Sequence, residues 1–175
     1  DYDSTMGYRT TENNRSTRFM ELIQQFDKVS WTDFQSIKYD VTLPDSLLYR
    51  INVNAVFRMR PEEAGSAAEV VSILQKWDRT AETDRVGPAH LNVFYNDLLR
   101  SKTITNETPT TDQVIESLIN TKAYFLKHFG KLEVTLGEYQ KLVRGDKELP
   151  LRGMADVLAA MYSTPHKNGV VKGFA

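Results

Sequence analysis

Residues 76–99, KWDRTAETDRVGPAHLNVFYNDLL, join two segments of helical period through a polar connector. The segment before the connector carries apolar residues at helical spacing, namely Val70, Val71, Leu74 and Trp77. Gly87-Pro88 begins the second helix, because proline suits a first helical turn. The apolar positions of this second helix are Leu91, Phe94, Tyr95 and Leu98. The stretch therefore predicts a helix, a connector and another helix.

Oxygen-bearing side chains alternate in the connector, as they do in a calcium loop: Asp78, Thr80, Glu82 and Asp84. An EF-hand loop counted from Asp78 needs glycine at its sixth position and glutamate at its twelfth. This chain has Thr83 and Ala89 there, and Arg79 and Arg85 stand beside the supposed ligands. The spacing favours a helix-to-helix joint over a metal site. We expect neither a metal nor a cofactor in this chain.

The helical period recurs along most of the chain. Capping boxes, in which a serine or threonine is followed by an acid or amide one turn later, begin three expected helices at Ser30, Thr110 and Thr135. Gly130 stands where a helix C-cap is expected. Residues 101–111 are polar and predict a surface loop. The expected helices cover residues 14–26, 30–39, 44–59, 61–77, 88–99, 110–129, 135–145 and 154–162, and Asn52 and Asn54 weaken the third of them.

These segments predict a mainly α fold, an irregular bundle of about seven helices in a single helical domain, residues 1–175. The tail STPHKNGVVKGFA, residues 163–175, has an Asn-Gly turn signal before an apolar stretch and predicts one strand at the C-terminus. We expect no partner for this strand within the chain. Because an unpaired strand leaves its backbone groups unsatisfied, residues 163–175 are expected to begin a strand of a missing core.

Composition excludes several classes of function. The chain has 22 basic and 23 acidic residues, so its balance gives no support to a nucleic-acid or anionic-membrane partner. No apolar run is long enough to span a bilayer. The absence of cysteine excludes thiol nucleophiles, thiolate metal sites and disulfides. His90, His128 and His166 have no partner at metal-ligand or triad spacing, so surface or cap roles are expected for them.

The stretch TENNRSTRFMELI, residues 11–23, gathers asparagines, arginines and hydroxyl side chains at the start of a helix. Asn13 or Asn14 is expected to cap the free backbone N–H groups. Arginine at a helix start has the wrong sign for the helix dipole, so Arg15 and Arg18 need another partner. Two alternatives stand equal, either carboxylates elsewhere in the chain or a ligand with acidic or carbonyl groups.

Four segments in order resemble the middle of the β chain of penicillin acylase-type enzymes, a family that includes acylases of homoserine lactones and of aculeacin. They are NNRSTRFMELI (13–23), KYD (38–40), LQKWDRTAETDRVGPAHLNVFYNDLL (74–99) and FGKLEVTLGEYQKLVRGDKELPLRGMADVLAAMY (129–162). The resemblance covers nearly the whole chain. It departs from the family at Met154, where many relatives have a second glycine.

The resemblance implies an N-terminal nucleophile hydrolase with an αββα core, which cleaves the amide between an acyl group and an amine in β-lactam or N-acyl homoserine lactone substrates. In the family a serine at the first residue of the β chain attacks, its own α-amino group acts as base, and asparagine and backbone donors hold the oxyanion. Residue 1 here is Asp1, and Ser4 is not N-terminal, so the nucleophile is expected outside this chain. Only Arg15 is carried over, in an orienting role.

The resemblance also implies partners and a location. The partners are the remaining parts of the acylase α and β chains, and the segment alone is expected to be inactive and to self-associate through exposed apolar faces. The family implies a periplasmic or secreted protein, and its members carry calcium elsewhere in the molecule. The alternative is a non-enzymatic, all-α interaction or scaffold domain.

Overall fold

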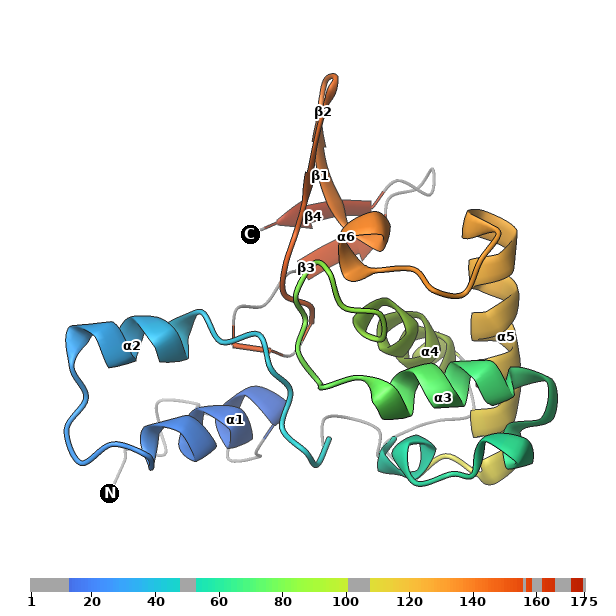
Figure 1. Cartoon of the computed structure of the whole chain (residues 1–175), viewed down its shortest axis with the longest axis horizontal. Coiled ribbons are helices and arrows are strands. Elements are labelled where there is room, and N and C mark those ends of the chain that lie inside the picture. Colours follow the sequence, from blue (N-terminus) through green and yellow to red (C-terminus); the bar gives the residue numbers. More distant parts are fainter. Residues whose placement is uncertain are drawn as a thin grey trace, which may run out of the picture.

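The computed structural model describes residues 13–47, 53–100, 108–155, 157–158, 162–165 and 171–174. Within these ranges the chain is mainly helical, as predicted, and its elements are arranged as Figure 1 shows. The helices are α1 (Asn14–Ile23), α2 (Trp31–Lys38), α3 (Ala68–Lys76), α4 (Pro88–Arg100), α5 (Thr111–Phe129), α6 (Leu136–Tyr139) and the 3-10 helices η2 (Asn54–Phe57) and η3 (Pro61–Ala67). The strands are β1 (Lys141–Arg144), β2 (Lys147–Pro150), β3 (Tyr162–Pro165) and β4 (Val171–Phe174).

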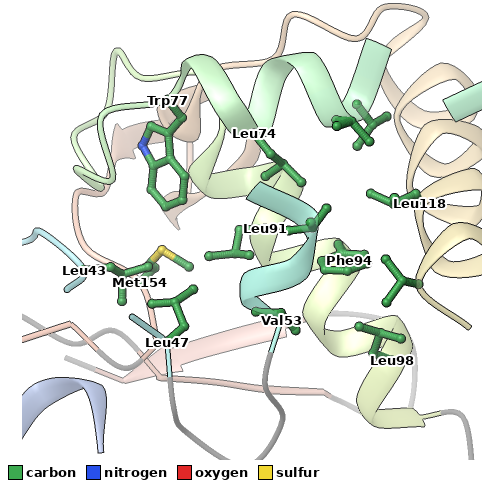
Figure 2. Close-up of a cluster of buried hydrophobic side chains, with 14 of the residues drawn as sticks. Leu43, Leu47, Val53, Leu74, Trp77, Leu91, Phe94, Leu98, Leu118 and Met154 are labelled. Carbon is green, nitrogen blue, oxygen red and sulfur yellow. The ribbon is translucent and has the colours of Figure 1, made fainter. Parts of the chain in front are cut away.

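Helices α3, α4 and α5 form the body of the domain around one apolar core. The predicted stripe of α3 is confirmed, since Val70, Val71 and Leu74 are fully buried. Figure 2 shows Leu74, Leu91, Phe94 and Leu118 pointing into this core from the three helices. Each such side chain contributes about 2 kcal/mol to the stability of the fold through the removal of apolar surface from water.

The predicted helix ends are confirmed where a local motif set them. The side chains of the cap residues Ser30, Thr110 and Thr135 each accept a hydrogen bond from the backbone N–H three residues later. The side chain of that later residue accepts in return from the backbone N–H of the cap residue. Gly130 ends α5 in the left-handed region, at φ 69°. Because these motifs satisfy free backbone groups within a few residues, they do not depend on the rest of the fold.

The connector, residues 77–87, lies in the middle of the structure and hydrogen-bonds to three distant segments. Its backbone pairs with residues 41–43 on one side and with residues 135–137 and 153 on the other. The bonds are Ala81 N–H to Val41 O (2.9 Å), Leu43 N–H to Arg79 O (3.0 Å), Leu136 N–H to Arg85 O (2.9 Å), Gly137 N–H to Thr83 O (2.8 Å) and Gly153 N–H to Ala81 O (2.8 Å). The joint that the sequence predicted is therefore also the point where four parts of the chain meet.

Trp77 and Gly87, at the two ends of the connector, are in contact with each other. Trp77 is buried, and its indole N–H donates to the carbonyl of Thr80 at 2.7 Å. Gly87 has φ 135°, and a Cβ added there would lie 2.5 Å from Trp77 Cγ. Only glycine has the conformation and the space for this contact. Pro88 can then start α4 directly beside the end of α3.

A second, smaller cluster joins the first turn of α4 to the last turns of α5. It contains Ala89, Phe125 and Val134, and His90 is fully buried beside them. The imidazole of His90 stacks on Phe125 with ring centroids 4.0 Å apart and an interplanar angle of 18°. Burial lowers the pKa of His90 to about 4, and a backbone contact with Leu132 opposes this shift only in part. His90 is therefore a neutral core residue and not the surface or cap residue that was expected.

Three predicted helices are wrong within the part of the chain that the structure covers. The helix expected at 135–145 ends at Tyr139, and β1 and β2 follow as an antiparallel hairpin with Leu142 opposite Leu149. The two-residue turn at Gly145-Asp146, with Gly145 at φ 61°, closes this hairpin. In the segment expected to form a helix over 154–162, Met154, Ala155, Val157 and Leu158 are non-helical, and residues 156 and 159–161 lie outside the described residues.

The expected helix over 44–59 is reduced to the short η2, residues 48–52 being outside the described ranges. The amide side chain of Asn54 bonds both backbone groups of Leu47, accepting from its N–H at 2.9 Å and donating to its carbonyl at 3.0 Å. These bonds offer the backbone of Leu47 an alternative to the helical ladder. Asparagine therefore turns the chain where apolar periodicity alone predicted a helix.

The predicted C-terminal strand exists as β4, but the expectation that it lacks a partner in this chain is wrong. It pairs antiparallel with β3, with Tyr162 opposite Phe174 and Pro165 opposite Val171. The two strands satisfy part of each other's backbone hydrogen bonding. That residues 163–175 continue into a core sheet stays a prediction.

Helices α1 and α2 lie side by side, apart from the body formed by α3, α4 and α5 (Figure 1). Several apolar side chains of these two helices are exposed, since Phe19, Trp31 and Phe34 are 36%, 71% and 45% exposed. The same holds on α5 for Ile119 and Leu126, which are 42% and 47% exposed. Periodicity identified these faces correctly as apolar, but no described residue covers them.

Replacing Gly87 with alanine should lower the free energy of unfolding by about 3 kcal/mol, because the new Cβ would strike Trp77 and force a disfavoured backbone angle. Urea denaturation of the chain measures the loss. Gly130→Ala is the matched control, since its Cβ would meet nothing within 4 Å, and it should cost only about 1 kcal/mol. Equal losses in the two variants would contradict the role given to Trp77.

Acid should destabilise the chain through His90. Since its folded pKa of about 4 lies below the ordinary value of 6.5, its contribution is complete above pH 6.5 and is lost as the pH falls toward 4. The loss amounts to roughly 3 kcal/mol at most, at about 1.4 kcal/mol for each pKa unit. Urea denaturation at pH 7, 6 and 5 should show a smaller pH dependence for His90→Leu than for the unaltered chain. Parallel curves would refute this assignment.

Candidate functional site

The start of α1 is organised by a reciprocal capping box between Asn13 and Ser16. Asn13 Oδ1 accepts from the backbone N–H of Ser16 at 2.9 Å, and Ser16 Oγ accepts from the backbone N–H of Asn13 at 2.9 Å. Of the two asparagines that the sequence offered as caps, Asn13 is therefore the one used, while Asn14 is buried in the first turn. This box fixes the direction in which Arg15 and Arg18 leave the helix.

Arg18 pairs with carboxylates of its own chain. Its Nε donates to Asp40 Oδ1 at 3.1 Å and its Nη2 to Asp40 Oδ2 at 3.2 Å, which is a bidentate contact. Nη1 adds a bond to Glu21 at 3.2 Å. The hydrogen bond to Asp40 raises the pKa of the Arg18 guanidinium above its ordinary value. For Arg18, the first of the two alternatives is correct.

Arg15 has a different environment. It is half-buried, and its Nη2 donates to the carbonyl oxygen of Leu158 at a long 3.4 Å. Across the described ranges, no carboxylate lies within ion-pair distance of it. Its remaining N–H groups find no partner in those ranges, so the guanidinium is available to carbonyl or carboxylate groups beyond them.

Thr17 adds an unsatisfied polar group one helical position from Arg18. Its hydroxyl oxygen is buried and has no hydrogen-bond partner among the residues described. Buried polar groups are nearly always hydrogen-bonded in folded proteins. The start of α1 therefore combines an available cation with a buried hydroxyl that lacks a partner.

The acidic connector is held by arginine and backbone donors. Asp78 accepts from the backbone N–H of Thr80 at 3.0 Å and from Arg85 Nε at 2.8 Å, and Arg85 also bonds Asp84 at 2.8 Å. These bonds orient the turn that follows Asp78. Glu82 pairs with Arg152 at 2.9 Å instead of facing the other acids. In the described part of the chain, no three His, Asp or Glu side chains are placed to hold a metal ion.

A polar cleft of about 260 Å³ lies between α4 and α5 and is lined in part by Asp97, Glu116 and Asn120. Asn120 Nδ2 donates to Asp97 at 3.1 Å, so two of these three polar groups are paired with each other. The other residues with expected roles are not gathered at either place. His128 lies at the end of α5 beside Tyr124, and Asp1, Ser4 and His166 fall outside the described residues.

None of the helices that the structure describes has the length and apolar character to cross a bilayer.

Sequence reasoning missed Asp40 as the residue that fixes Arg18, because the two lie 22 positions apart. The signal was present in the segment KYD, which places Asp40 directly after α2. Periodicity does not report such a pair, since it describes only neighbours on one helix. The contact has to be read from the path of the chain.

The Arg18–Asp40 pair should show a coupling free energy of about 1 to 2 kcal/mol in a double-mutant cycle of Arg18→Ala and Asp40→Ala. Its side chains are only 21% and 16% exposed, so water screens the contact weakly. The control is Lys141–Glu148, whose side chains are 36% and 56% exposed and whose coupling should stay below about 0.5 kcal/mol. Chemical denaturation measures both cycles, and equal coupling in the two pairs would count against a special role for Asp40.

Comparison with known proteins agrees with the resemblance found in the sequence. The family model described as penicillin amidase matches residues 1–166, which is nearly the whole chain. No curated protein matches it. The match includes Arg15, Arg18 and Asp40, the connector and the β1–β2 hairpin. The chain therefore belongs to the penicillin amidase family, whose members are acylase-type hydrolases.

Proposed function

We propose that this chain is the helical β-chain segment of a penicillin acylase-type enzyme that hydrolyses the amide between an acyl group and an amine. The observation that carries the proposal is the arrangement at the start of α1. There Arg15 is half-buried, has only a carbonyl partner within the described ranges, and lies beside an arginine that is fully paired. Family membership supports the reaction class.

The reaction assigns different steps to different parts of the parent protein. An N-terminal serine outside this segment attacks the amide carbon with its Oγ, and its α-amino group accepts the proton. N–H donors hold the oxyanion of the tetrahedral intermediate. The protonated α-amino group then gives its proton to the amide nitrogen, and the intermediate collapses to an acyl-enzyme as the C–N bond breaks and the neutral amine leaves. Water then attacks the acyl-enzyme and releases the acid. These reaction steps require no metal or cofactor from the present segment.

Arg15 suits a positioning role in this reaction. Its guanidinium keeps its charge at every relevant pH and presents N–H donors in a fixed planar fork. In the structure one of these donors already reaches a carbonyl, that of Leu158. We assign Arg15 the task of holding the amide oxygen of the oxyanion asparagine or a polar group of the substrate, with β-lactam and N-acyl homoserine lactone substrates as the candidate classes.

The exposed apolar face of α1 and α2 supports the assignment of partners. Its members are Phe19, Met20, Val29, Trp31 and Phe34, and the rings of Trp31 and Phe34 stack with centroids 5.6 Å apart. An apolar face of this kind marks an interaction surface. We assign it to the remaining α- and β-chain parts of the acylase, and self-association is the expected behaviour of the segment when those parts are absent. A periplasmic or secreted location belongs to the same proposal.

The test uses the parent protein expressed from its complete reading frame, with chromogenic phenylacetyl and fatty-acyl anilides as substrates. The intact protein should hydrolyse at least one of them, and the isolated segment none. Arg15→Ala should lower kcat by roughly 10- to 100-fold, because a misplaced oxyanion donor or substrate loses much of its effect. Arg15→Lys should recover part of this loss.

Arg144→Ala is the matched control, since this arginine lies at the exposed end of β1 and away from α1. Its kcat should stay within twofold of the unaltered enzyme. Turnover by the rigorously purified segment would contradict the proposal. So would an intact protein that hydrolyses no acyl amide, which would favour a scaffold function.

A further inference from the structure

We propose that Asp40 is a positioning residue for the acylase reaction, which acts through Arg18 to fix helix α1 and so the place of Arg15. This inference rests on the proposed function of the parent protein. It concerns a residue whose hydrogen bonds are to Arg18 and to the backbone of Thr42, and not to Arg15. Its support is the chain of contacts that leads from the connector to the start of α1.

The first contact in this series holds Asp40 against the main body of the structure. Asp40 Oδ1 accepts from the backbone N–H of Thr42 at 3.0 Å, so the carboxylate is oriented by the chain that follows it. The carbonyl of Val41 in turn accepts from the connector residue Ala81 at 2.9 Å. The carboxylate is therefore held in a fixed position relative to the connector.

The second contact, between Asp40 and Arg18, fixes the position of α1 relative to Asp40. Two N–H···O bonds from Arg18 to the two oxygens of Asp40 define both a distance and a plane, which one bond to a point charge cannot do. Arg15 precedes Arg18 by three residues, so both side chains leave the same face of the helix, nearly one turn apart. A rotation or shift of α1 that moved Arg15 would have to break the Arg18–Asp40 pair.

The apolar side chains of α1 are at most half-buried, so packing holds this helix only weakly. Asn14 is its only fully buried residue, and Phe19 and Met20 are 36% and 48% exposed. The carbonyl that Arg15 reaches, that of Leu158, follows the core residues Met154 and Val157. Gly153, just before them, donates to Ala81 of the connector. Asp40 fixes Arg15 through Arg18, and Leu158 fixes it directly. The chain segments that carry Asp40 and Leu158 both hydrogen-bond to the connector.

The experiment is a kinetic double-mutant cycle in the intact acylase with Asp40→Asn, Arg15→Ala and the double variant. Asparagine keeps the shape of Asp40 but turns an N–H group toward Arg18. Asp40→Asn should lower kcat about 10-fold and leave KM within twofold. Because Asp40 acts only through Arg15, the double variant should have the kcat of Arg15→Ala alone.

Conservative variants separate positioning from a general loss of structure. Arg18→Lys keeps the charge but lacks the planar fork, so it should resemble Asp40→Asn, whereas Asp40→Glu keeps the bidentate carboxylate and should recover at least half of kcat. Glu148→Gln, which removes the exposed Lys141 pair on the β1–β2 hairpin, should leave kcat unchanged. Thermal unfolding checks that all variants fold. If Asp40→Asn does not fold, the kcat values of Asp40→Glu and Arg18→Lys are compared instead.

The outcomes distinguish this inference from the proposed function. Unaltered kcat in Asp40→Asn, or a double variant whose loss is the product of the two single losses, would overturn the role of Asp40 while the enzyme assignment stands. An unaltered intact protein without amide hydrolysis would overturn the proposed function and this inference with it.

Discussion

The contact between Trp77 and Gly87 is the constraint on which the rest of the structure depends. The indole ring occupies the space that a side chain at residue 87 would need, and its N–H donates to Thr80 inside the connector. The connector is thereby held between α3 and α4 with its backbone groups turned outward to residues 41–43, 135–137 and 153. A connector free to move would leave these three segments without the partner that places them.

What the sequence predicted well was local in origin. The capping boxes at Ser30, Thr110 and Thr135 act within one turn, and the stripe ending at Trp77 acts along one helix, so both can be read from spacing alone. The helix expected through Gly145 is wrong because Gly145 adopts φ 61° and, with Asp146, closes the β1–β2 hairpin, a local turn that overrides the helical period. The helix at 44–59 failed because Asn54 bonds the backbone of Leu47, an interaction between residues seven positions apart.

Two other features could not be predicted, for a different physical reason. Apolar periodicity identifies which face of a helix avoids water, but not what covers it, and Trp31 and Phe34 stand at apolar positions of α2 yet are exposed. Similarly, the sequence required partners for Arg15 and Arg18 without naming them. Asp40 lies 22 residues from Arg18 and Leu158 lies 143 residues from Arg15, and only the folded path of the chain brings each pair together.

Arg15 and Arg79 are the half-buried arginines for which no described carboxylate lies within ion-pair distance. Arg18, Arg60, Arg85 and Arg152 are paired with carboxylates. Arg79 lies over the ring of Phe57 at 3.4 Å, and its buried Nη1 has no hydrogen-bond partner among the described residues. Arg58, Arg100 and Arg144 are exposed, so water satisfies them. Arg15 is half-buried with one long bond to a carbonyl. Desolvating a guanidinium without full compensation costs free energy. For Arg15 that cost is offset if its other N–H groups meet groups supplied by the rest of the enzyme, which agrees with the proposal that the start of α1 lies near the catalytic centre.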